Sequence, residues 1–111
     1  MNANLPKPVK RQMNALIDKA HELALRNALE ELNTHFNRWR RGEIDSFELQ
    51  DLIHKFHDGQ SREIYNRFSD RRTSQLPIAT AYAVANGLID EKDVPPEVMP
   101  FIATLLRFWR E

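Results

Sequence analysis

Hydrophobic side chains follow a helical pattern most clearly between Ile44 and Phe68. They recur there at steps of three and four residues, the spacing of an α-helix with one buried face. Asp45 and Glu48, at the start, have the spacing of a capping box, in which each side chain accepts a hydrogen bond from the other residue's backbone amide. The sequence therefore predicts a helix over 45–68, with a stripe formed by Leu49, Leu52, Ile53, Phe56, Gln60, Ile64 and Phe68.

Gly59 lies inside this stripe. Glycine in a helix interior costs roughly 1 kcal/mol relative to alanine, so it either breaks the helix or allows another backbone to approach closely. The hydrophobic positions keep their register on both sides of Gly59. We therefore favour one continuous helix, which the glycine can kink, over two separate helices.

A longer helix is predicted over 9–41, after a polar, flexible arm with two prolines over 1–8. Two offset hydrophobic stripes run along this helix, so it should contact more than one neighbour. Only residues 42–44 separate it from the capping box, and so short a connection makes the two helices antiparallel neighbours. The first stripe is Leu16, Ala20, Leu23 and Asn27; the second, with the steps of a coiled-coil seam, is Leu25, Leu29, Leu32, Phe36 and Trp39.

Two shorter helices are predicted in the last third of the chain. One spans 75–86 and ends at Gly87, since glycine readily adopts the left-handed conformation that closes a helix. A turn and a second helix together span 95–110, because Pro100 interrupts any helix that begins at Pro95. No strand-like alternation of any length is visible. We expect an all-α fold, a single four-helix, bundle-like domain over 1–111 that is built on the long antiparallel hairpin.

Composition narrows the class of protein. A chain of 111 residues favours one domain. The absence of cysteine excludes thiol chemistry and cysteine-bound zinc. Neither a signal peptide nor a hydrophobic run of about 18 residues is visible, so we expect a soluble, cytoplasmic protein that does not enter a membrane.

The formal net charge is zero, but charge is unevenly distributed. Residues 1–41 contain eight Lys or Arg and four Asp or Glu, whereas residues 42–70 contain three and seven. Opposite charges favour the pairing of the first two helices, although each exposed ion pair adds only ~0.2–1 kcal/mol. A net charge of zero is not typical of a dedicated nucleic-acid-binding protein.

A polar cluster on the second helix is the feature of the sequence that comes nearest to a metal-binding or catalytic site. Asp51, His54 and Asp58 lie on one helix face, with His57 beside them. Carboxylate–histidine pairs hold metals in some helical bundles, where a second ligand set faces them. The first helix has Asp18 at a comparable site, but an antiparallel hairpin places it opposite residue 66. We therefore interpret the cluster as a solvated acidic face with one histidine packed against the core, and we assign no metal, cofactor or catalytic residue. A metal-binding or catalytic bundle is the third functional hypothesis.

Five arginines are candidates for contacts with nucleic acid. Trp39 lies among the first three and could stack on a base. The alternative, which we favour, is that these arginines complement the negative carboxyl end of the first helix while Trp39 packs in the core. The five are Arg38, Arg40, Arg41, Arg71 and Arg72.

The last helix carries the strongest indication of function. From Pro100 to Trp109 only Thr104 and Arg107 are overtly polar, so the helix lacks the solvent-exposed face of a surface helix. We expect a subunit or partner interface there, so the sequence favours a small helical interaction or regulatory protein that is oligomeric or bound to a protein partner. A nucleic-acid-associated accessory factor is the second hypothesis. The expected anchors of the interface are Phe101, Leu105, Phe108 and Trp109.

Overall fold

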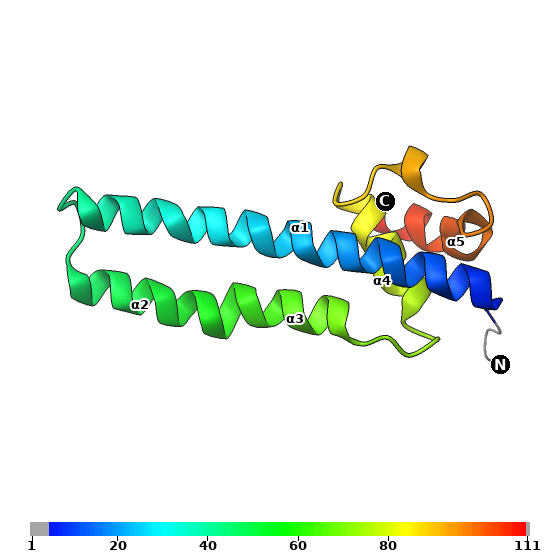
Figure 1. The fold of residues 1–111 in the computed structure, drawn as a ribbon, viewed down its shortest axis with the longest axis horizontal. Coiled ribbons are helices and arrows are strands. Elements are labelled where there is room, and N and C mark those ends of the chain that lie inside the picture. Colours follow the sequence, from blue (N-terminus) through cyan, green and yellow to red (C-terminus); the bar gives the residue numbers. More distant parts are fainter. Residues whose placement is uncertain (1–4, 111) are drawn as a thin grey trace.

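The computed structural model describes residues 5–110, and all regular structure in that range is helical (Figure 1). This confirms the all-α class and the bundle-like arrangement of a long N-terminal helix against later helices. No helix among the described residues is both long and apolar enough to cross a membrane. The elements are α1 (Lys7–Arg40), α2 (Ser46–Phe56), the π-helical turn η1 (His57–Ser61), α3 (Arg62–Ser69), α4 (Leu76–Ala85), the 3₁₀ turn η2 (Glu91–Asp93) and α5 (Met99–Arg110).

The first helix begins two residues before its predicted start. Pro8 lies in the first turn of α1, where its missing N–H does no harm. Leu5, which the sequence assigns to a loose arm, is buried in the main core instead. The prediction of a flexible N-terminal segment is therefore wrong for residues 5–8, and residues 1–4 lie outside the described range.

The connection between α1 and α2 is held by local hydrogen bonds at both ends. Gly42 has a φ of +78°, and its amide and that of Glu43 donate to the last carbonyls of α1 in a Schellman motif. The predicted capping box is present: the Glu48 amide donates to Asp45 Oδ1 at 2.8 Å, and the Asp45 amide donates to Glu48 Oε1 at 3.0 Å. These caps turn the chain back along α1 to form the antiparallel hairpin of Figure 1.

The helix after the turn stays helical through Gly59 but is not α-helical throughout. Residues 57–61 form one wider π-helical turn between α2 and α3. Apart from its chain neighbours and the nearby backbone of its own helix, nothing lies within 4 Å of the Cβ position that Gly59 lacks. Phe56 and Phe68 are twelve residues apart, so a regular α-helix would place them about 120° apart around its axis. The π-turn absorbs one residue and reduces that angle to about 20°. This is why the stripe keeps its register across the glycine.

The main hydrophobic core lies at one end of the molecule, which we call the body (residues 5–21 and 68–110) (Figure 1). There α1 packs against α3 and α4, and α5 packs against α4. Phe68 at the end of α3 is fully buried and stacks on His21, with ring centroids 5.6 Å apart. The other large side chains that are fully buried in this core are Met13, Ile17, Leu76, Val98 and Ile102.

The rest of the hairpin, which we call the arm (residues 22–67), projects from the body and has little core of its own. Ala28, Ile44 and Leu49 are its only buried hydrophobic residues, and none of them belongs to the body's core. The described chain is accordingly elongated, at 54 × 26 × 26 Å. Several large apolar side chains of the arm are exposed, namely Leu23, Leu29, Trp39, Phe47 and Tyr65.

Candidate interaction surface

One line of residues along α1 changes from charged to hydrophobic where the helix leaves the body. Arg11, Asp18, Leu25 and Leu32 follow one another at seven-residue intervals, which is two helical turns, so they lie in one row. In the body, Arg71 Nη2 donates to Asp18 Oδ1 at 2.7 Å. In the arm the same row is leucine. We call the four apolar side chains that follow this row the hairpin strip: Leu25, Leu29, Leu32 and Phe36.

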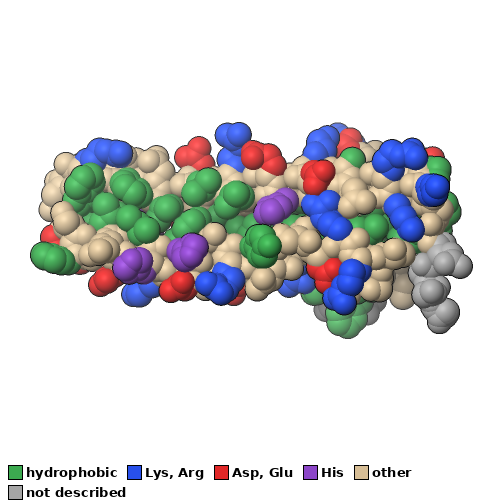
Figure 2. Space-filling model, turned by 60° about the horizontal axis from the view of Figure 1, so that its bottom comes forward, with side chains coloured by type: hydrophobic (Ala, Val, Ile, Leu, Met, Phe, Trp, Pro, Cys, Tyr) green, Lys and Arg blue, Asp and Glu red, His purple; other side chains and the backbone are tan. Residues whose placement is uncertain are grey.

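The hairpin strip is open to solvent in the described chain. Leu29 is 47% exposed, and the other three side chains are half-buried. The body's core lies on another side of α1, because Leu16 and Ala20, which belong to it, are each two residues from Asp18 and so about 160° away around the helix. Figure 2 shows the result: hydrophobic side chains form a band along the arm, and charged side chains line its edges.

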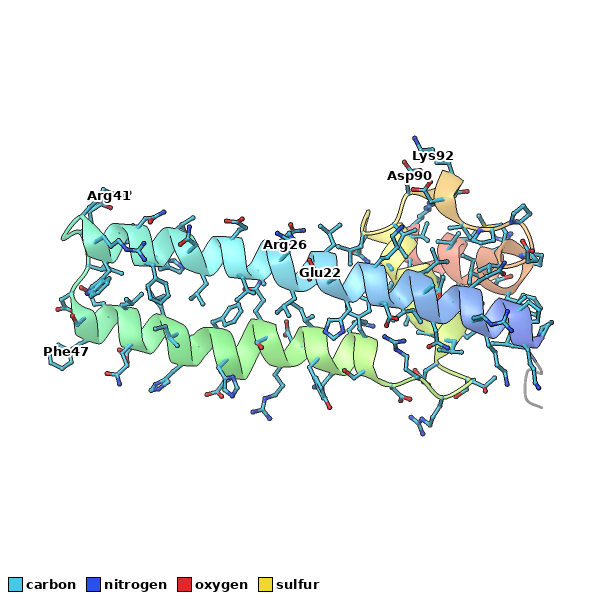
Figure 3. All side chains as sticks on the ribbon, viewed as in Figure 1. Glu22, Arg26, Arg41, Phe47, Asp90 and Lys92 are labelled. Atoms are coloured by element: carbon cyan, nitrogen blue, oxygen red, sulfur yellow. The ribbon has the colours of Figure 1, made fainter. Side chains whose placement is uncertain are left out.

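Charged side chains border the hairpin strip at both ends. Glu22 and Arg26 form an exposed ion pair at 2.9 Å near the body (Figure 3). Near the hairpin tip, the Arg40 guanidinium lies 5.9 Å from the Phe36 ring centroid and donates to Asn37 Oδ1 at 2.9 Å. An apolar strip with charged margins has the layout of a helix–helix interface.

The stripe predicted on α5 is only partly available to a partner. Phe108 is 72% exposed and Phe101 is 37% exposed. Leu105, in contrast, packs against the body's core. The Trp109 ring lies edge-on to the Tyr82 ring, with centroids 5.5 Å apart. Two of the four expected anchors therefore have contacts within the chain.

An aromatic and cationic cluster joins the arm to the body beneath Trp109. The Arg67 guanidinium lies 4.0 Å from the Tyr82 ring centroid and 5.9 Å from that of Trp109. Cation–π contacts of this kind contribute about 0.5–2 kcal/mol. Sequence reasoning missed this role for Arg67, because α3, α4 and α5 supply one residue each and no spacing along the chain links them.

A groove of about 730 Å³ lies between arm and body, lined by α1, η1, α3 and α4. Its volume is within the range of ligand sites. Several of its polar side chains are paired with neighbours: Gln60 Nε2 donates to Glu31 Oε1 at 3.4 Å, and Asp70 accepts from the Arg72 guanidinium. The groove therefore presents fewer free polar groups than its lining suggests.

Comparison with known proteins does not assign a function to this surface. Comparisons with protein-family models, with curated proteins and with solved structures find no match for this chain. The functional argument therefore rests on the surfaces themselves.

The polar cluster predicted on the second helix lies on its solvent side. Asp51, His54, His57 and Asp58 are all exposed, so neither histidine packs against the core as expected, and Asp58 pairs with Arg62 at 3.9 Å. Across residues 5–110, no three His, Cys, Asp or Glu side chains are grouped so that they could hold a metal ion. The structure thus places the four residues on one surface without a second ligand set.

The arginines predicted for nucleic acid fall into two separate groups, one at the hairpin tip and one between α3 and α4 (Figure 1). At the tip, Arg41 Nε donates to Glu43 Oε2 at 2.7 Å, and Arg38 lies 3.8 Å from the same carboxylate. The hydrogen bond from Arg41 lowers the pKa of the Glu43 carboxyl. Trp39 is not packed in the core as expected: it is partly exposed, and its indole Nε1 donates to Ser46 Oγ at 3.0 Å.

The arginines of the second group also bind side chains of the same chain. Arg71 donates to Asn14 Oδ1 at 2.9 Å as well as to Asp18. Arg72 pairs with Asp70 at 2.6 Å, and its hydrogen bonds lower the pKa of that carboxyl. In each of these pairs the carboxylate offsets part of the positive potential of the arginine, so these contacts do not favour the nucleic-acid hypothesis.

Proposed function

We propose that this chain is a small helical interaction protein, oligomeric or joined to a protein partner, and that it docks through the hairpin strip. The observation that carries the proposal is the row of four large apolar side chains on a two-helix arm, with no third helix over them in the described chain. A regulatory role and a cytoplasmic location remain predictions from the sequence.

Burial of the strip supplies a driving force for docking. Complete burial of a Leu or Phe side chain stabilises by roughly 1.5–3 kcal/mol, and half-buried side chains gain a fraction of that. Leu29, near the middle of the strip and 47% exposed, has the most to gain of the four. Buried apolar side chains at the centre of an interface commonly dominate its affinity.

The α5 stripe is a second candidate surface of the same kind. Phe108 carries it, because this phenyl ring is 72% exposed and extends a chain of edge-on aromatic contacts through Trp109 to Tyr82. Phe108→Glu tests this surface better than a change at Leu105, which packs on the body's core, or at Trp109, which packs on Tyr82 of α4.

The test of the proposed function compares two charged substitutions on α1. Leu29→Glu places a charge on the hairpin strip, whereas Leu23→Glu places one at an exposed leucine outside it. We expect Leu29→Glu to abolish association of the purified protein, with itself or with a purified partner from its own cells, and Leu23→Glu to leave it intact. A parent that shows no association dependent on Leu29 would defeat the proposal.

A further inference from the structure

The hairpin strip is symmetric about its own midpoint, which falls between Glu30 and Glu31. Leu29 and Leu32 are equally far from this point along the chain, and so are Leu25 and Phe36. Two copies of α1 that run antiparallel and cross there would set Leu29 against Leu32 of the other copy. Leu25 would meet Phe36 in the same way, so each copy would cover the other's apolar side chains with its own.

The charges at the two ends of the strip match the same arrangement. Glu22 borders the end near the body, and Arg40 borders the end near the hairpin tip. Antiparallel pairing places Glu22 beside Arg40 of the other copy, twice in each dimer. Parallel pairing would place Glu22 beside Glu22 and Arg40 beside Arg40, and like charges disfavour such a complex. Glu22 also pairs with Arg26 of its own chain at 2.9 Å, but that pair is exposed, so the charges at the two ends still favour the antiparallel over the parallel dimer.

The surroundings of the strip leave room for a second arm. The body's core lies on another side of α1, and antiparallel arms carry their bodies to opposite ends. Glu31, next to the midpoint, accepts a hydrogen bond from Gln60 of the π-turn, so its carboxylate is directed towards the second helix of its own hairpin. The Glu31 carboxylates of the two copies are therefore not forced together at the crossing point.

We infer that the occupant of the hairpin strip is a second copy of this chain, bound antiparallel about a twofold axis that passes between Glu30 and Glu31. This inference rests on the proposed function, because it names the partner of the same surface. A twofold interface uses one patch on both subunits, so a strip that complements itself is sufficient. The two arms together form a four-helix bundle and acquire the core that each lacks alone.

Sedimentation velocity across the micromolar range tests the dimer. We expect the parent to be dimeric and Leu29→Glu to raise the dimer dissociation constant by about a hundredfold or more, since a central side chain is changed in both subunits. Leu23→Glu, an equally large change at an exposed leucine outside the strip, should remain dimeric. Far-ultraviolet circular dichroism of both variants checks that the helices are intact.

Disulfide cross-linking tests the direction of pairing, because the chain has no cysteine of its own. We expect an oxidised mixture of Glu22→Cys and Arg40→Cys proteins to form a mixed disulfide dimer. Each variant alone should form far less, because its two cysteines lie at opposite ends of the interface. Efficient dimers of each variant alone, with no mixed product, would show parallel pairing and overturn the inference.

The outcomes separate this inference from the proposed function. A parent that is monomeric throughout the concentration range overturns the dimer. If the monomer still binds another purified protein through Leu29, the interaction function survives with a different occupant. If the monomer binds nothing through Leu29, both proposals fall.

Discussion

In the body α1 packs against α4 and the end of α3, whereas along the arm it has only the second part of the hairpin (α2, η1 and most of α3) beside it. The residues in one row of α1 differ between the two regions in the same way. Asp18 stands in the row where Arg71 is present to pair with it, and Leu25 and Leu32 stand in it where no such element lies alongside. On α1, therefore, the row carries a paired carboxylate in the body and partly exposed leucines in the arm.

The largest expected effect comes from a matched pair of phenylalanines, one in each region. Phe68 is fully buried in the body, and Phe47 is 79% exposed at the hairpin tip (Figure 3). Phe68→Ala should lower the free energy of unfolding by about 3–5 kcal/mol, because it removes a phenyl ring and leaves a cavity. Phe47→Ala should change it by less than about 0.5 kcal/mol. Urea denaturation measures both, and similar losses at the two sites would contradict the division into body and arm.

Two glycines in the arm should respond to alanine with opposite signs. Gly42 has a φ of +78°, a conformation that costs an L-residue roughly 1–2 kcal/mol, so Gly42→Ala should destabilise the protein. Gly59 has helical neighbours and free space at its missing Cβ, so Gly59→Ala should stabilise by about 0.4–1 kcal/mol. Thermal unfolding of the two variants checks the signs. Destabilisation by Gly59→Ala would mean that the π-turn itself needs glycine.

The hairpin turn should be separable from the body, because its hydrogen bonds are local. Asp45→Ala removes the cap of α2 and should cost about 0.5–2 kcal/mol. Hydrogen exchange should quicken at the first amides of α2 while amides in α4 and α5 keep their protection. Asp51→Ala, an exposed change on the same helix that leaves the cap intact, is the control. Equal loss of protection in arm and body would show that the two regions unfold together.

The smallest effect concerns acid pH. Hydrogen bonds from Arg41 and Arg72 lower the pKa of Glu43, at the arm's tip, and of Asp70, in the body. A carboxyl whose pKa is lower in the folded than in the unfolded state contributes stability above its unfolded pKa and loses it as the pH falls through its folded pKa. Glu43→Gln and Asp70→Asn should therefore differ from the parent slightly at neutral pH and not at strongly acidic pH. Urea titrations at the two pH values measure this, and a difference that persists in acid would point to another cause.

Local features were predictable from the sequence to the extent that nearby residues decide them. The capping box forms from Asp45 and Glu48 alone, and Gly42 takes the left-handed conformation that closes α1. Leu25 and Leu29 were predicted as part of a hydrophobic stripe, because helical spacing reports which residues share a face. The same spacing does not report which face another element covers. The exposure of the hairpin strip can be seen only in the structure, because it depends on which side of α1 the body packs against.

The remaining differences arise where the contact involves residues distant in sequence. The four residues of the α5 stripe were predicted as anchors of one interface, but Leu105 packs on the core and Trp109 packs on Tyr82. Arg67 over Tyr82 joins residues of α3 and α4 that no local pattern connects. The widening of the helix at Gly59 was likewise hidden, because the even steps from Phe56 to Phe68 look regular unless the angle for each residue is added up.

The π-turn also has a consequence for the length of the chain. It holds one residue more than an α-helical turn, so it is a position where the helix can lose a residue without altering its ends. Deleting Gly59 should let α2 and α3 close into one regular helix while Phe56 and Phe68 keep their faces. α1 has no such turn, so deleting Glu30 should rotate its two halves by about 100° relative to each other. Leu25 and Leu29 would then no longer lie on the same face as Leu32 and Phe36. Single-residue deletions should therefore be tolerated at 57–61 and rejected along α1.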